Sequence, residues 1–342
     1  MKILVGISGG VDSAYTAKLY LDRGDEVVGC ILKMHEFSDI SGAECVCREL
    51  GIKLVVIDAT SPFDEEIKTY FRDEYLKGRT PNPCIVCNER VKFKLLYEYA
   101  RENGFDKIAT GHYAKVGKHA DKEGAYFIEC AADSQKDQSY MLYRLPNGIL
   151  GMLELPLGTM TKDEVRKHTS NAGMSVAKAK DSQEICFLPD GGYPEYIESV
   201  VGKLPEGDFI NDFGEPLGKH KGIIRYTVGQ RKGLGIALGK RMFVSAIDPT
   251  QNTVTLSEEL KGNRTVALSG VVLASGTDVS KFEGRKLKAK LRYTAPLIDV
   301  SVEILDGGRA VLYSESELKA APGQSAVVYD EGRFILGGFI DS

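Results

Sequence analysis

Apolar runs and amphipathic stretches alternate along the first part of the chain. The apolar runs occupy residues 3–7, 27–32, 54–57 and 107–109. Continuous runs of this length are typical of strands that are buried on both faces of a parallel sheet. The stretches between them have helical spacing and stop at Gly24, Gly51 and Gly104, because glycine readily adopts the left-handed conformation that ends a helix. This alternation predicts an α/β fold with a doubly wound parallel sheet, in which ligands bind at the carboxyl ends of the strands.

Polar residues mark two further helix starts. Asn88 is suited to cap a helix that carries Val91 and Leu95 on its apolar face. Thr161 and Glu164 have the spacing of a capping box, in which each side chain binds the backbone amide of the other residue. We therefore expect one helix to begin at Asn88 and another directly after Thr161.

The pattern of apolar and polar residues changes near residue 200. Short apolar segments then alternate with Gly, Asp and Asn turns, at residues 243–247, 253–256, 266–273, 288–293, 300–304, 310–313, 326–329 and 334–339. A spacing of about ten residues is typical of β-barrels and β-sandwiches. We therefore divide the chain into residues 1–200, 201–261 and 262–342.

Composition places the chain among ordinary globular proteins. It has 342 residues, 43% hydrophobic and 27% charged, which suits two or three domains with sizeable cores. The sequence contains no apolar run near 18 residues, and we expect residues 1–7 to form a strand that enters a glycine loop and not a signal peptide. We expect a cytoplasmic protein with no membrane partner.

The distribution of charge says more than its total. The formal net charge of -4 argues against a general RNA binder. However, residues 215–241 hold seven Lys or Arg against one acid, and residues 281–292 hold six against one. Each basic segment is either a solvated face or a nucleic-acid contact, and charge alone leaves both open.

A glycine loop joins the first strand to the first helix. Ser8, Gly9, Gly10, Asp12 and Ser13 form the pattern Ser-Gly-Gly-x-Asp-Ser. Glycines let the backbone approach a ligand, and hydroxyls with the free amides of a helix start surround an anion. No Gly-x4-Gly-Lys-Ser/Thr occurs in the sequence, so the loop lacks the lysine that contacts β and γ phosphates in usual P-loops. The pattern favours pyrophosphate release over γ-phosphate transfer.

The seven cysteines include a pair with a chemical signature. Cys84 and Cys87 follow Pro81-Asn82-Pro83, and Cys87 directly precedes the helix expected from Asn88. A thiol at a helix start is expected to have a lowered pKa. Cys30 lies in an apolar strand and reads as core, while Cys186 in its polar, lysine-rich surroundings has no distinguishing feature by itself.

Several segments occur together in a fixed order. They are Ser-Gly-Gly-Val-Asp-Ser at 8–13, Arg-Thr-Pro-Asn-Pro at 79–83 with Cys-Asn at 87–88, Ala-Thr-Gly-His-Tyr at 109–113, Lys-Asp-Gln-Ser-Tyr at 136–140, Lys-Asp-Ser at 180–182 with Ile-Cys-Phe at 185–187, and Gly-Gln-Arg-Lys-Gly-Leu-Gly at 229–235. This series resembles the tRNA-specific 2-thiouridylase family of PP-loop ATP pyrophosphatases along essentially the whole chain.

The resemblance implies a fold and a reaction. It implies an adenine-nucleotide α hydrolase-like catalytic domain, a small central β domain and a C-terminal β-barrel that helps to bind tRNA. ATP, with Mg²⁺, would adenylate the C2 oxygen of the wobble uridine (position 34), and sulfur would replace that oxygen, releasing AMP and pyrophosphate. The substrates would be the tRNAs for Lys, Glu and Gln, and a desulfurase or relay protein would donate the sulfur.

The resemblance also assigns residues. ATP would contact Gly6, Ile7, Ser8, Gly9, Gly10, Val11, Asp12, Ser13, Leu32 and Gly111. Cys87 would be the nucleophile and Cys186 the carrier of the persulfide. Asn82, Pro83 and Cys84 would lie against the target base. Other tRNA contacts would come from His112, Lys136, Asp137, Gln138, Arg292, Tyr293 and Gln324.

One position departs from the familiar members, which have Asp where this chain has Cys84. Cys84, Cys87 and Cys186 together are three thiols, enough for a [4Fe–4S] cluster with one open iron, or for zinc if a fourth ligand joined them. Cys45 and Cys47 are candidates for extra ligands. A persulfide relay, by contrast, needs only Cys87 and Cys186.

Two other functions fit parts of the sequence. One is a different PP-loop ATP pyrophosphatase, an amidotransferase or a ligase, which would not need Cys87 or Cys186. The other is a zinc-dependent, non-catalytic tRNA-binding protein, which would leave the glycine loop unexplained.

Overall fold

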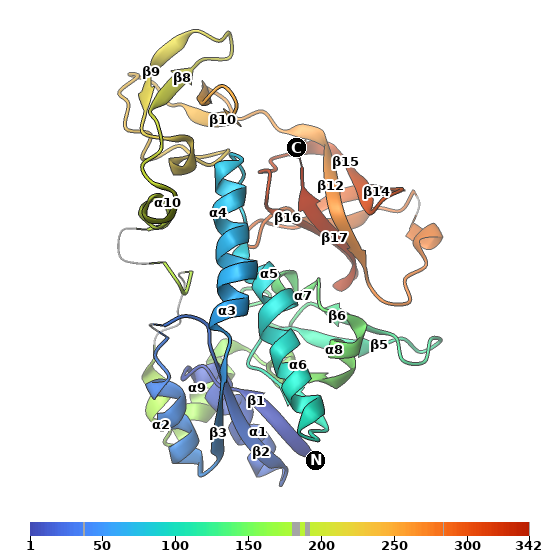
Figure 1. Cartoon of the computed structure of the whole chain (residues 1–342). Coiled ribbons are helices and arrows are strands. Elements are labelled where there is room, and N and C mark those ends of the chain that lie inside the picture. The colour runs from blue at the N-terminus through green and yellow to red at the C-terminus, as the bar shows by residue number, and fades with distance from the viewer. Residues whose placement is uncertain (37, 180–184, 189–191, 283, 342) are drawn as a thin grey trace.

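The computed structural model describes residues 1–342 except 37, 180–184, 189–191, 283 and 342. A parallel sheet with helices, a small central sheet and a β-barrel follow one another along the chain (Figure 1). In the described part of the chain, no helix has the length and apolarity needed to cross a bilayer.

The parallel sheet forms as predicted from the apolar runs. Its strands are β1 (Lys2–Gly6), β2 (Glu26–Lys33), β3 (Lys53–Asp58), β4 (Lys107–Ala109) and β7 (Leu153–Glu154). They lie in the order β3-β2-β1-β4-β7, and every pairing is parallel. Alternate residues of β1 enter different cores: Ile3 and Val5 pack on one face, and Leu4 packs on the other. The doubly wound α/β prediction is confirmed.

Helices cover both faces of this sheet. They include α1 (Val11–Asp22), α2 (Ser41–Leu50), α9 (Lys162–Asn171) and α6 (Phe93–Glu102). Gly51 ends α2 in the left-handed conformation, with φ of 66°, as its sequence position predicts. The capping box at Thr161 and Glu164 is also present. Shorter helices are α7 (Ser139–Leu142), α8 (Asn147–Met152), η3 (Pro156–Thr159) and η4 (Ser175–Lys178).

Two helices are interrupted by π-helical turns. The first runs through α3 (Thr60–Phe63), η1 (Asp64–Lys68) and α4 (Thr69–Leu76), and the second through α5 (Pro83–Cys87), η2 (Asn88–Lys92) and α6. The prediction that Asn88 begins a helix is therefore wrong. The helix begins at Pro83, because proline at the first helical position already has a helical φ and lacks only an amide that would be unbonded there. Turns of the π type often occur at functional sites.

The central sheet lies at the top of Figure 1 and packs on the end of α4. Its strands are β8 (Gly207–Ile210), β9 (Pro216–His220), β10 (Phe243–Asp248) and β11 (Thr253–Ser257), in the order β10-β11-β8-β9. Helix α10 (Tyr193–Val201) and the turn η5 (Ile223–Arg225) precede and interrupt it. Phe71 and Tyr75 of α4 share a core with Phe209 and Val244 of the sheet.

The C-terminal strands close into an antiparallel barrel, as predicted. They are β12 (Asn263–Leu273), β13 (Leu287–Lys290), β14 (Ile298–Leu305), β15 (Arg309–Leu318), β16 (Ser325–Asp330) and β17 (Arg333–Ile340), with η6 (Val279–Phe282) between the first two. Pairing of β12 with β17 closes the ring.

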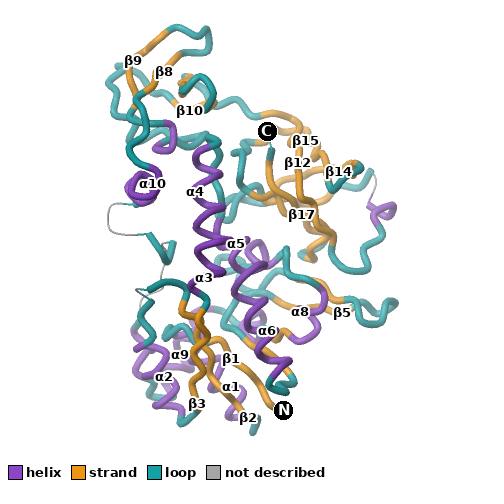
Figure 2. The backbone as a smooth tube through the Cα atoms, viewed as in Figure 1, coloured by secondary structure: helices purple, strands orange, loops and turns teal. Residues whose placement is uncertain are grey.

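One hairpin of the first half of the chain extends this barrel sheet. It consists of β5 (Lys115–Lys118) and β6 (Tyr126–Glu129), and β6 pairs with β17. Strands from the first half of the chain and from its C-terminal part thus share one sheet, and Figure 2 shows β5 on the side of the molecule that carries β17. The division into residues 1–200, 201–261 and 262–342 stays a prediction.

Candidate active site

The glycine loop turns sharply between β1 and α1. Gly9 has a φ of 79°, and a Cβ there would lie 2.8 Å from the backbone of Gly42. The hydroxyl of Ser13 accepts from the amide of Ser8 at 3.1 Å and lies 3.2 Å from the Ser8 hydroxyl. No side chain caps α1, so its first amides point into the loop as donors for an anion.

Leu32 and Gly111 are the two residues farther along the chain that the resemblance assigns to ATP. Leu32 lies near the carboxyl end of β2, the strand next to β1. A Cβ on Gly111 would lie 2.7 Å from the backbone carbon of Asp12 and 2.8 Å from the amide nitrogen of Ser13. Only glycine fits at position 111 because the loop passes so close.

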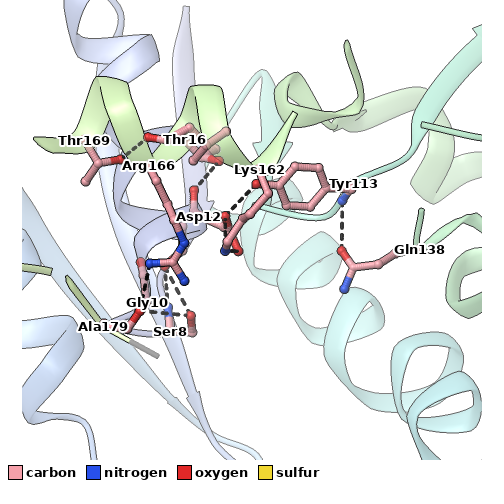
Figure 3. A network of polar contacts seen from close by, with 12 residues as sticks. Ser8, Gly10, Asp12, Thr16, Tyr113, Gln138, Lys162, Arg166, Thr169 and Ala179 are labelled. Carbon is pink, nitrogen blue, oxygen red and sulfur yellow. Dashed lines mark hydrogen bonds and ion pairs between the residues drawn. The ribbon is translucent and has the colours of Figure 1, made fainter. Parts of the chain in front are cut away.

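The structure adds a cation that the sequence analysis missed. Figure 3 shows the Lys162 side chain reaching from α9 to Asp12. The ammonium contacts both Asp12 carboxylate oxygens, at 2.9 and 2.7 Å, and the Tyr113 hydroxyl donates to one of them at 2.8 Å. The only signal in the sequence was the capping box, since Lys162 directly follows the cap residue Thr161.

The thiols Cys84 and Cys87 lie in the first turns of the helix that begins at Pro83. Cys84 is exposed, whereas Cys87 is buried at 7% exposure. Cys87 lies a full turn inside the helix, where the field of the helix start has largely decayed. It packs with Phe63 and Val86 in a cluster that Leu32 also joins, so the sheet edge predicted to bind ATP borders the thiol.

The expectation of a lowered Cys87 pKa is wrong. Burial raises the pKa of Cys87 to about 11, against an opposing effect of the Lys92 ammonium. Removal from water disfavours the thiolate more strongly than a nearby cation or helix end favours it. Partial removal of their sulfur atoms from water likewise raises the pKa of Cys84 and of Cys186, although both residues are exposed as a whole, and Lys92 opposes the shift in each case. Cys87 is thus protonated at neutral pH.

Cys186 lies in the same region as the other two thiols. Each thiolate charge would affect a neighbour: Cys186 raises the pKa of Cys87, and Cys84 raises that of Cys186. Phe187, the next residue, holds this segment, because its ring packs edge-on against Phe63, Phe71 and Tyr196 at centroid distances of 5.5, 5.2 and 5.4 Å. The Lys-Asp-Ser motif at 180–182 lies outside the described residues.

The three thiols do not form a ligand set in this conformation. Among the described residues, no three His, Cys, Asp or Glu side chains are grouped so that they could hold a metal ion. Cys45 is exposed on α2, and Cys47 is buried in the core between α2 and the sheet. Cys30 is core as predicted, at 1% exposure. These residues therefore do not fit a cluster or a zinc ion as they stand.

Comparison with known proteins identifies the family. Three family profiles match in succession: a tRNA methyl transferase HUP domain at residues 1–190, a tRNA methyl transferase PRC-barrel domain at 194–258 and an aminomethyltransferase beta-barrel domain at 275–340. The chain is 40% identical over 358 residues to tRNA-specific 2-thiouridylase MnmA 1 of Clostridium tetani, covering 100% of this chain and 97% of that protein. The chain belongs to the tRNA-specific 2-thiouridylase family.

Other members are similar to the same extent. The MnmA proteins of Acetivibrio thermocellus and Treponema denticola are 40% and 41% identical, covering 99% and 100% of this chain and 98% of each relative. Among solved structures, NMN synthetase from Francisella tularensis matches 53% of this chain and 66% of its own, with 18% identity and a TM-score of 0.35, which is too low to add to the argument. The profile descriptions mention methyl transfer, whereas these relatives are named for thiolation.

Three consecutive residues that the 2-thiouridylase resemblance assigns to the target base, Asn82, Pro83 and Cys84, lie at the start of the helix that carries Cys87. Asn82 precedes the helix, and its side-chain amide lies 3.7 Å from the Met141 sulfur. Pro83 is buried beside exposed Cys84.

His112 bonds to the Thr110 hydroxyl at 2.9 Å, and burial lowers its pKa to about 3. His112 is therefore neutral at physiological pH.

The Lys136-Asp137-Gln138 motif of the 2-thiouridylase family has internal partners here. Asp137 is buried; its carboxylate accepts from the amide of Ala131 at 2.9 Å and the hydroxyl of Ser139 at 2.9 Å. The Gln138 carbonyl accepts from the amide of Tyr113 at 2.9 Å (Figure 3). Since the Tyr113 hydroxyl binds Asp12, this motif is connected to the glycine loop.

Proposed function

We propose that this protein uses ATP to replace the C2 oxygen of the wobble uridine of tRNA with sulfur, as a tRNA-uridine 2-sulfurtransferase. The observation that carries the proposal is that Cys87 and Cys186 are electrostatic neighbours, and that Leu32, on the strand next to the one that leads into the glycine loop, packs against the cluster of Cys87. Neither the loop nor the pair of thiols by itself would require the other. An amidotransferase or ligase of the same superfamily would need the loop without the thiols.

Adenylation is the first step. The uridine C2 oxygen attacks the α phosphate of ATP, and the bond to pyrophosphate breaks, so that the oxygen becomes part of an AMP leaving group. The loop amides and the Ser8 and Ser13 hydroxyls hold the departing pyrophosphate. Mg²⁺ is expected to accompany the nucleotide and to offset its charge.

Sulfur transfer follows through two thiols. The terminal sulfur of a Cys186 persulfide attacks C2 and displaces AMP, which leaves the base joined to Cys186 through a disulfide. The Cys87 thiolate then attacks the Cys186 sulfur, which releases 2-thiouridine and forms a Cys87–Cys186 disulfide. A cellular thiol must reduce that disulfide, and a sulfur donor protein must reload Cys186, before the next turnover.

The basic residues of the central region support tRNA as the substrate. Arg231, Lys240 and Arg241 line a hollow of about 590 Å³ in the central sheet region, which suits the phosphate backbone of tRNA. We also propose that the protein works in the cytoplasm, whose reducing conditions keep thiols such as Cys87 and Cys186 available for the reaction.

The direct test is the product. Substrate tRNAs of the Lys, Glu and Gln types are incubated with protein, ATP, Mg²⁺, a thiol reductant and a cysteine desulfurase with cysteine, which supplies persulfide sulfur, and their nucleosides are analysed by mass spectrometry. We expect 2-thiouridine at position 34 with equal amounts of AMP and pyrophosphate, and loss of both with Ser13→Ala. ADP as the nucleotide product, or thiolation that persists in the Cys87→Ala, Cys186→Ala double variant, would contradict the proposal.

A further inference from the structure

A buried lysine borders the glycine loop. Lys162 is the first residue of α9 and only 6% exposed. Its ammonium lies between the two oxygens of Asp12, which is the second residue of α1 and directly follows the loop. Lysine is rarely buried unless its charge is paired. The pair joins two segments separated by 150 residues.

Asp12 is the more exposed partner of the pair. The Asp12 side chain is 30% exposed, whereas that of Lys162 is 8% exposed. The Tyr113 hydroxyl holds the same carboxylate from another direction, at 2.8 Å. Tyr113 thus fixes the Asp12 carboxylate, and the carboxylate fixes the ammonium of Lys162 beside the first turn of α1 (Figure 3).

Packing alone does not account for this arrangement. A buried ion pair usually stabilises a fold no better than apolar side chains of the same volume would. At this place it also sets the charge that an incoming anion meets. Asp12 without its lysine would place a bare negative charge beside the amides of α1 and would repel a phosphate group.

We propose that Lys162 is a phosphate-binding residue, which contacts the β and γ phosphates of ATP and the pyrophosphate that leaves. Asp12 holds the ammonium in place, and phosphate oxygens replace part of the contacts that the ammonium makes in the unbound protein. The lysine that usual P-loops carry within the loop is here supplied by a separate helix. The inference rests on the proposed function for the identity of the anion.

Direct binding of inorganic pyrophosphate tests this role without tRNA. Titration calorimetry is done without divalent metal, so that binding of metal by Asp12 does not enter. We expect Lys162→Gln to weaken pyrophosphate binding about 10- to 100-fold, the usual range for one charge-assisted hydrogen bond. The matched control is Lys18→Gln. Lys18 lies on α1, the helix of Asp12, and also pairs with an aspartate, Asp22, but in an exposed i,i+4 pair at 2.6 Å. This control should bind as the wild type does.

A double variant separates binding from neutralisation. If Lys162 only cancels the charge of Asp12, the Asp12→Asn, Lys162→Gln protein should bind pyrophosphate as tightly as the Asp12→Asn single variant. If Lys162 is a ligand, the double variant should bind more weakly than that single variant. This variant also avoids leaving a partly buried carboxylate without its cation, so it remains informative if Lys162→Gln alone fails to fold.

The outcomes are distinct from those for the proposed function. Wild-type affinity in Lys162→Gln, or equal affinity of the double variant and Asp12→Asn, overturns the inference even when tRNA is thiolated. Absence of measurable pyrophosphate and ATP binding by the wild-type protein overturns it as well. If the wild type binds pyrophosphate and Lys162→Gln does not, yet no tRNA is thiolated, the inference stands and the proposed substrate falls.

Discussion

The side-chain amide of Gln324 donates a hydrogen bond of 2.8 Å to the carbonyl oxygen of Thr80. Gln324 directly precedes β16 of the barrel, and Thr80 lies two residues before Asn82. The amide of Thr80 in turn donates to the carbonyl of Pro322 at 2.8 Å. A Cβ at Gly323, where φ is 89°, would lie 2.9 Å from that amide nitrogen. The barrel therefore positions the segment that leads into the helix of Cys84 and Cys87.

Gln324 is expected to act on tRNA binding through this segment. Gln324→Glu removes the donor and keeps the shape, so we predict tRNA binding about 2- to 10-fold weaker, as for one ordinary hydrogen bond. ATP binding should not change. Filter binding of tRNA and titration of ATP check this, with Gln251→Glu in an exposed turn of the central sheet as the control. A parallel loss of both affinities would indicate unfolding instead.

Arg292 offers a different kind of contact. It is exposed after β13, next to half-buried Tyr293, whose ring lies 6.1 Å from that of Tyr140. If Arg292 binds one phosphate, Arg292→Ala should weaken tRNA binding and reduce the slope of log affinity against log salt by about 0.9. Arg309→Ala, an exposed arginine of the same barrel, should leave the slope unchanged. An unchanged slope in Arg292→Ala would remove the support for a phosphate contact.

Local chemistry explains which parts of the structure the sequence could predict. The strands around the glycine loop and the end of α2 at Gly51 depend on neighbouring residues and were predicted correctly. Lys162 and the β5–β6 hairpin depend on partners far along the chain, so no local pattern revealed them. The helix start was misplaced because Asn88 was given more weight than Pro83. The Cys87 pKa was misjudged because a helix end can be recognised in a sequence, whereas burial cannot.

Phe187 is expected to hold Cys186 within reach of Cys87. Each of its three ring contacts contributes about 0.5–1.5 kcal/mol, so Phe187→Ala should lower the population of the Cys87–Cys186 disulfide about tenfold in a glutathione redox buffer. Phe187→Leu should recover part of it because it retains apolar volume. Mass spectrometry of peptides measures the disulfide, and Phe213→Ala, at 89% exposure, is the control. Equal disulfide populations in all variants would show that Phe187 does not position the thiol.

The raised pKa of Cys87 predicts a pH dependence. With a pKa of about 11, the thiolate fraction without substrates should rise about tenfold per pH unit between pH 7 and 10. Alkylation of Cys87 by iodoacetamide should follow the same slope, measured in the Cys84→Ser, Cys186→Ser protein by peptide mass spectrometry. Removal of the Lys92 charge by Lys92→Met should slow alkylation further, since that ammonium favours the thiolate. A plateau reached by pH 8 would contradict the effect of burial.

Cys84 distinguishes a persulfide relay from an iron–sulfur mechanism. Cys84 is exposed, and the described His, Cys, Asp and Glu residues form no group of three that could hold a metal. Since the relay uses only Cys87 and Cys186, we predict that Cys84→Ser thiolates tRNA within about threefold of the parent rate, a change of less than 1 kcal/mol. The Cys87→Ser and Cys186→Ser proteins should be inactive. After anaerobic reconstitution with iron and sulfide, iron analysis and absorbance spectroscopy should show fewer than the four irons per protein of a [4Fe–4S] cluster, in the parent and in Cys84→Ser alike. If the parent instead binds four irons, and Cys84→Ser loses iron and activity together, the two-thiol relay cannot be the mechanism.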